Sequence, residues 1–164
     1  MLDKSKKTGD SNFSEQEIAR FDALADSWWD PEGKYKTALD FNRARLNVIK
    51  AQIENHFGQG NLPPDYSALS VIDIGSGGGL ISEPLAKLGA QVTGIDASAV
   101  SVEVARRHAQ NTGVKVDYQH KLSSEVVEEG RQYDVVINAE VVEHVPDQQQ
   151  LMRECASLVK PGGL

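Results

Sequence analysis

The chain lacks the features that define secreted, membrane-spanning and nucleic-acid-binding proteins. One cysteine, Cys155, stands in 164 residues, which excludes an internal disulfide framework and fits a reducing compartment. No apolar run approaches the roughly 18 residues of a membrane span, and no apolar stretch follows the N-terminal lysines as in a signal peptide. The net charge is −7 and no dense basic stripe is present, so we expect no nucleic-acid partner. These absences predict a cytoplasmic protein with a small substrate.

Three segments follow one another along the chain. Residues 1–13 are polar and lysine-containing and are expected to form a mobile tail. Residues 14–64 carry two helical patterns, one opened by a capping box of Ser14 and Glu17, the other over residues 38–57. We expect this helical segment to pack over a cofactor cleft that belongs to the remaining part, residues 65–164.

Strand and helix patterns alternate over residues 65–164. We expect four strands at residues 69–74, 91–95, 114–118 and 133–138, with helices after the glycine loop to about 88, at 99–111 and around 148–158. This alternation is typical of an α/β protein with a Rossmann-like, doubly wound, mostly parallel sheet. In such a sheet the first and fourth strands are neighbours, and ligands bind where the strand order reverses.

A glycine-rich loop follows the first strand. Residues 73–79 read Asp-Ile-Gly-Ser-Gly-Gly-Gly, and Asp96 ends the next strand. Glycines let backbone approach a ligand, and an acid at that strand end can accept the hydroxyl protons of a ribose. Leu80 replaces the third glycine of a dinucleotide fingerprint, and no lysine completes a P-loop. Because a carboxylate at Asp73 repels a pyrophosphate and suits a sulfonium or ammonium, the pattern favours a cationic adenosine cofactor bound by Asp73, Gly75, Gly77 and Asp96.

Two acids and a histidine follow the fourth strand. Glu140, Glu143 and His144 stand at i, i+3 and i+4, so one helical turn would place them on one face. Three interpretations remain open. The group holds a divalent metal such as Mg²⁺; it lines the cleft and supplies a general base; or the acids only complement a helix N-terminus.

These motifs together resemble one family of enzymes. The paired tryptophans Trp28 and Trp29, the Asn42-x-x-Arg45-Leu46 motif, the glycine loop and residues 140–147 are similar to ubiquinone-biosynthesis O-methyltransferases, in the class I S-adenosylmethionine-dependent superfamily. The resemblance implies methylation of a phenolic hydroxyl on polyprenylated catechol or quinol intermediates. It also implies that Arg45, Gly75, Asp96 and Ala139 contact S-adenosylmethionine, and that the Glu-x-x-Glu-His turn binds a divalent metal.

Further expectations come from the same resemblance. The family's sheet has seven strands, so we expect a chain truncated at its C-terminus. We also expect peripheral contact with the inner membrane and with other proteins of ubiquinone biosynthesis.

The chemistry requires that the acceptor phenol lose a proton. A metal held by Glu140, Glu143 and His144 would lower the phenol's pKa; without a metal, His144 is the best general base. Trp28 and Trp29 either cover the cofactor cleft or only pack against the domain. An O- or N-methyltransferase for another small molecule, or a catalytically silent cofactor-binding module, remains the alternative function.

Overall fold

The computed structural model describes residues 12–23, 29–30, 36–60 and 62–164. Its centre is a parallel four-stranded sheet of order β3-β2-β1-β4. The strands are β1 (Ser70–Ile74), β2 (Gln91–Asp96), β3 (Asp117–His120) and β4 (Val135–Asn138). The strand order reverses between β1 and β4, which confirms the predicted doubly wound α/β fold and places a crevice at their carboxyl ends.

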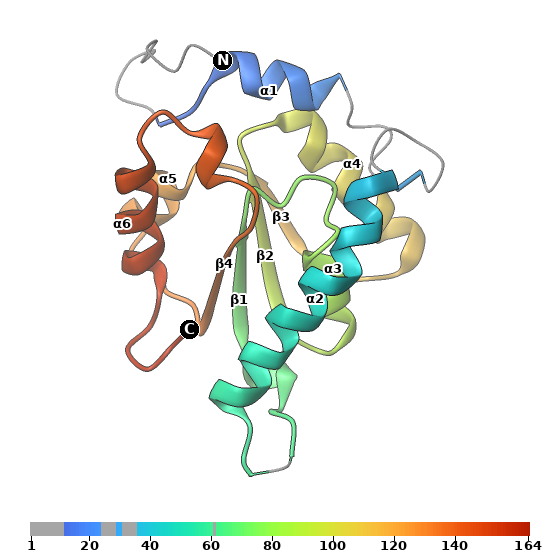
Figure 1. The fold of residues 1–164 in the computed structure, drawn as a ribbon, viewed down its shortest axis with the longest axis vertical. Coiled ribbons are helices and arrows are strands. Elements are labelled where there is room, and N and C mark those ends of the chain that lie inside the picture. The colour runs from blue at the N-terminus through green and yellow to red at the C-terminus, as the bar shows by residue number, and fades with distance from the viewer. Residues whose placement is uncertain (1–11, 24–28, 31–35, 61) are drawn as a thin grey trace.

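Helices cover both faces of the sheet (Figure 1). One face carries α2 (Lys36–Phe57), α3 (Ser82–Lys87) and α4 (Ala99–Thr112), and the other carries α5 (Ser123–Glu128) and α6 (Gln148–Leu158). The apolar strand residues therefore alternate between two cores. Val71 and Val92 pack with Leu85 of α3, whereas Ile72 packs with Leu158 of α6. Burial on both faces explains why the central strand β1 reads as a continuous, largely β-branched run.

A short helix, α1 (Glu15–Asp22), lies across the end of the sheet where the strands finish (Figure 1). Ser14 caps it, because its hydroxyl accepts the Glu17 N–H at 3.4 Å. The side-chain amide of Asn12 donates to the Asp147 carbonyl at 2.7 Å, and the Asp147 N–H donates to Asn12 Oδ1 at 2.8 Å. Residues 1–11 of the expected tail and Trp28 lie outside the described residues.

Three elements differ from the sequence predictions. β3 begins at Asp117 rather than at residue 114, because Gly113 ends α4 in a left-handed conformation and the Val114 N–H still bonds the Ala109 carbonyl. Helix α5 was not predicted, because its six residues are too few to show a clear period. The helix after the glycine loop begins at Ser82, not directly after Gly79, since residues 77–81 form turns.

Leu164 bonds to β4 on the side away from β1. Its N–H donates to the Asp134 carbonyl, and its carbonyl accepts the Val136 N–H, both at 2.9 Å. The outer edge of β4 is therefore paired at these two groups. None of the helices in the described part of the chain is both long and apolar enough to cross a membrane.

Candidate active site

A cavity of about 300 Å³ opens at the carboxyl ends of β1, β2 and β4, beneath α1. This volume is at the lower end of the range for small-molecule sites. The cavity brings together all six residues predicted to bind the cofactor and both predicted catalytic residues: Arg45, Asp73, Gly75, Gly77, Asp96, Ala139, Glu140 and His144. Glu143, the remaining predicted site residue, does not line it.

The glycine loop has a backbone that other residues would not tolerate. Gly75 has φ +70°, and a Cβ built there would lie 2.3 Å from Cγ2 of Val141, in the segment after β4. The N–H groups of Gly75 and Ser76 both donate to the Ile95 carbonyl, at 2.8 and 2.9 Å. The loop is thus fixed between β2 and the turn after β4, with its backbone against the cavity.

Asp96 lies beside this loop at the end of β2. One carboxylate oxygen accepts the Gly77 N–H and the other the Ser98 N–H, each at 2.8 Å. Burial raises the pKa of Asp96 above its ordinary value, and these N–H groups oppose that rise. Each oxygen keeps a further lone pair, so the carboxylate can also accept hydroxyl protons from a ligand.

Asp73 is more deeply buried than its predicted role requires. It is 2% exposed, and one carboxylate oxygen accepts the Ser82 hydroxyl at 2.6 Å. Burial is the main cause that raises its pKa to about 7, and the nearby Asp96 adds to the rise. Asp73 therefore joins β1 to the start of α3 and borders the cavity, with a charge that depends on pH near neutrality.

The predicted acidic turn does not form as expected. Only Val142–His144 is helical, as a 3₁₀ turn, and Glu140 lies outside it with φ +59°. The Glu140 carboxylate lies 3.1 Å from the Arg45 guanidinium, whereas the His144 ring contacts Glu17. The prediction that Glu140, Glu143 and His144 share one face is therefore wrong, because long-range partners draw their side chains in different directions.

This separation also corrects the metal hypothesis. In the part of the chain that the structure describes, no three His, Cys, Asp or Glu side chains form a group that could hold a metal ion. Glu143 Oε1 lies 4.0 Å from His144 Nε2, but Glu140 is turned to Arg45 instead. The residues present do not fit the divalent metal that the spacing favoured.

Two side chains of α1 contact the His144 imidazole. Its Nδ1 lies 2.7 Å from Glu17 Oε2, and the Phe21 ring meets the imidazole edge-on at a centroid distance of 5.1 Å. The His144 side chain is 28% exposed and that of Glu17 12% exposed. A carboxylate beside one ring nitrogen fixes the orientation of the imidazole. This arrangement suits a general base.

Sequence reasoning missed two contacts that acids of α1 make near the cavity. Glu17 was assigned to the helix cap, but its side chain lies against His144. Asp22 was given no role in the site, although its carboxylate accepts the Ser98 hydroxyl beside Asp96. Each acid contacts a residue more than 70 positions away in sequence, so local patterns held no signal for these contacts.

Comparisons with known proteins agree with the site. A family model described as "Methyltransferase domain" matches residues 72–164. The chain is 44% identical over 149 residues to the "Ubiquinone biosynthesis O-methyltransferase" of Chelativorans sp. (strain BNC1), covering 90% of this chain and 59% of that protein. It is 47% identical over 152 residues to the protein of the same name from Paramagnetospirillum magneticum, covering 92% and 61%. The chain thus spans about three fifths of the length of these relatives.

Solved structures share the fold. Magnesium protoporphyrin IX methyltransferase from Synechocystis PCC 6803, determined with bound SAM, superposes with a TM-score of 0.65 at 24% identity, over 92% of this chain and 75% of that one. The YcgJ protein of Bacillus subtilis superposes with a TM-score of 0.63 at 24% identity, over 74% and 48%. These findings confirm the predicted resemblance, and the chain belongs to the methyltransferase-domain family.

Proposed function

We propose that this chain forms the cofactor-binding part of an S-adenosylmethionine-dependent O-methyltransferase that acts on a polyprenylated catechol. The observation that carries the proposal is the single cavity in which the glycine loop, Asp96, Arg45 and His144 meet. The names of the relatives at 44% and 47% identity support the choice of acceptor.

The donor groups of the cavity fit the parts of this cofactor. Asp96 would accept the ribose hydroxyls, and the Arg45 guanidinium would bind the methionyl carboxylate in exchange for Glu140. Gly75 and Gly77 would allow the cofactor to approach the backbone, and Ala139 also lines the cavity. S-adenosylmethionine supplies an electrophilic methyl group, and the electrons of the broken carbon–sulfur bond stay on sulfur.

The chain's own part in catalysis is to orient the acceptor and remove its proton. A phenol with a pKa near ~10 is mostly protonated at neutral pH, so a base must take the proton as the oxygen bonds to carbon. His144 would accept that proton, with Glu17 stabilising the resulting imidazolium at 2.7 Å. Glu140, paired with Arg45, would act on the cofactor side and not as the base.

The helical segment of residues 14–64 would cover the cleft. Phe13, Ile18 and Phe21 form apolar walls beside His144, which suit an aromatic ring. Because these walls exclude water, electrostatic interactions inside the cavity become stronger. Peripheral membrane contact, through which a polyprenyl tail would be presented, belongs to the same proposal.

The cofactor is tested by isothermal titration with S-adenosylhomocysteine and with NAD. Binding of the first with no heat from the second is expected; the reverse result would point to a dehydrogenase and refute the proposal.

The acceptor is tested by methylation assays on the full-length protein, with catechols that carry or lack a prenyl tail. We expect methylation of both catechols, with a lower KM for the prenylated one. Cofactor binding without any catechol methylation would favour a silent module or another acceptor.

A further inference from the structure

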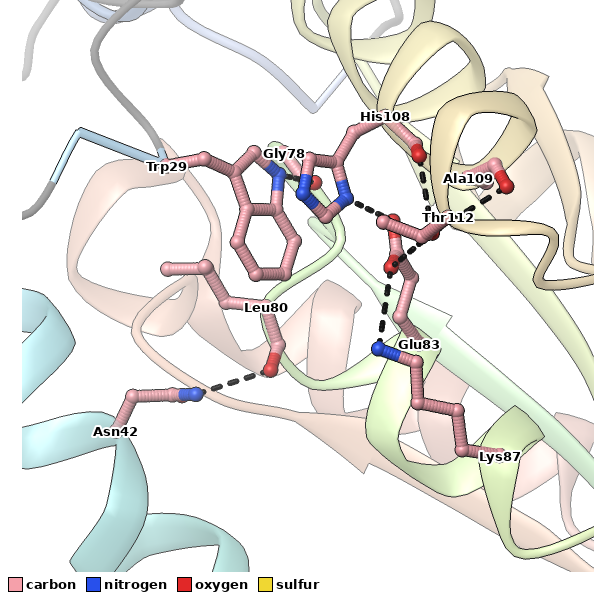
Figure 2. Close-up of polar contacts among 9 residues, drawn as sticks. All are labelled: Trp29, Asn42, Gly78, Leu80, Glu83, Lys87, His108, Ala109 and Thr112. Carbon is pink, nitrogen blue, oxygen red and sulfur yellow. Dashed lines mark hydrogen bonds and ion pairs between the residues drawn. The ribbon is translucent and has the colours of Figure 1, made fainter.

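The outer side of the glycine loop carries a contact that no catalytic role explains. The indole N–H of Trp29 donates to the carbonyl of Gly78 at 2.8 Å (Figure 2). Gly75 and Gly77 line the cofactor cavity, but Gly78 does not. Trp29 therefore binds the loop from outside, at a backbone group that the cofactor does not reach.

The Trp29 indole also stacks on a histidine whose ring contacts a buried acid. It stacks on the His108 imidazole with centroids 3.7 Å apart and planes 3° from parallel. His108 Nδ1 lies 2.7 Å from Glu83 Oε1, and Thr112 donates to the other oxygen of Glu83 at 3.2 Å. Glu83 is fully buried in the first turn of α3, just after the loop. Loop, Glu83, His108 and Trp29 thus form a closed ring of contacts (Figure 2).

A second side chain holds the loop two residues later. The amide of Asn42, on α2, donates to the Leu80 carbonyl at 2.9 Å, and Asn42 is only 8% exposed (Figure 2). Two residues distant in sequence from the loop therefore bind alternate carbonyls of it. Plain packing needs no such donors, because an apolar side chain would fill the same space without a buried polar group.

We propose that Trp29 and Asn42 are positioning residues for the cofactor: they hold the glycine loop in its binding conformation, Trp29 from outside the cavity and Asn42 from the cavity wall. This inference rests on the proposed function. A loop with glycines at positions 75, 77, 78 and 79 has many backbone conformations, and fixing them costs free energy when the ligand binds. Docking of Trp29 and Asn42 lowers that cost in advance, so cofactor binding and docking of the two side chains stabilise each other.

The test compares cofactor affinity in matched variants of the full-length protein. Trp29→Phe keeps an aromatic ring to stack on His108 and removes only the N–H. Asn42→Leu keeps the side-chain volume and removes the donor. Each should raise the Kd for S-adenosylhomocysteine roughly three- to tenfold, the worth of one net hydrogen bond. Phe41→Leu, on the same helix and 64% exposed, is the control and should leave the Kd unchanged.

A spectroscopic readout separates positioning from general support of the fold. In protein labelled with 5-fluorotryptophan, the ¹⁹F resonance that disappears in Trp29→Phe belongs to Trp29. Saturation with S-adenosylhomocysteine should shift this resonance, because cofactor binding and docking of Trp29 on the loop stabilise each other and the docked state becomes more populated.

Two results overturn the inference. One is a Kd within twofold of the parent in both Trp29→Phe and Asn42→Leu, and the other is a Trp29 resonance that does not move at saturation. Failure of the unaltered protein to bind S-adenosylhomocysteine is a different result, which refutes the proposed function itself.

Discussion

The two sides of the cavity are built in different ways. On the cofactor side, Gly75, Gly77 and Asp96 belong to two neighbouring strands and are joined by backbone hydrogen bonds. On the acceptor side, His144 is oriented by side chains of α1, from more than 120 residues away in sequence. The first side is a product of local sequence, whereas the second depends on how the N-terminal helices dock.

This difference decides which substitutions separate binding from catalysis. Changes on the cofactor side should alter the loop and the cofactor's Kd together. Changes on the acceptor side should lower kcat and leave the cofactor in place. Four predictions test this division, and they run from the largest expected effect to the smallest.

His144→Asn should separate the two sides most strongly. Loss of a general base lowers kcat by roughly 10² to 10⁴, while the Kd for S-adenosylhomocysteine should stay within twofold. Glu143→Gln is the matched control, because its side chain does not line the cavity, and it should keep nearly full activity. A His144 variant with more than a tenth of the parent kcat, measured on the full-length protein, would contradict this role.

Gly75→Ala should disturb both sides at once. At φ +70° an alanine is strained, and its Cβ would lie 2.3 Å from Val141; together these effects should cost about 3 kcal/mol in the free energy of unfolding. Gly113→Ala has the same strain at φ +69° with no atom within 4 Å and should cost about 1 kcal/mol. Adding Val141→Ala to Gly75→Ala should recover part of the loss. Equal costs at the two glycines, in denaturant titrations, would refute the clash.

Asp73→Asn should change how stability depends on pH. With a pKa of about 7 in the folded protein and 3.8 as the ordinary value, the folded state binds a proton that the unfolded state has released. The contribution of Asp73 to the free energy of unfolding therefore falls as pH rises through this window, by roughly 2–3 kcal/mol between pH 5 and pH 8. Asparagine still accepts from Ser82 and removes this fall. Parallel pH profiles for parent and variant would show that Asp73 does not titrate there.

Arg45→Met should have a smaller effect, confined to the cofactor. Loss of one charge-assisted hydrogen bond should raise the Kd for S-adenosylhomocysteine about tenfold, since such bonds contribute roughly 1.5–3 kcal/mol, partly offset by water. Glu140→Gln should change the Kd less than twofold, because the Glu140 carboxylate is 67% exposed and exposed ion pairs contribute little. A larger effect from Glu140 than from Arg45, in calorimetric titrations, would reverse their assigned roles.

The sequence predicted the parts of the molecule that local patterns determine. Apolar runs separated by helical periods led to four parallel strands, and the spacing of Gly75 and Asp96 indicated that the glycine loop and this acid lie side by side at one cavity. The turn at residues 140–144 was predicted as a helix because its spacing allows one. This prediction was wrong because Arg45 contacts Glu140 and Glu17 contacts His144, and both partners are distant in sequence from the turn. His108 had no visible partner in sequence, since Glu83 and Trp29 reach it only in the folded chain.

The central claim is that Asp96 and the glycine loop bind the adenosine end of S-adenosylmethionine. The most direct test is calorimetric titration of S-adenosylhomocysteine into the parent, Asp96→Asn and Asp117→Asn proteins. Asp117 is an exposed acid at the start of β3, at the opposite end of the sheet. We predict an unchanged Kd for Asp117→Asn and a Kd at least roughly thirtyfold higher for Asp96→Asn, as expected when a partly buried acceptor of charge-assisted bonds is lost. Equal binding by all three proteins would contradict the account.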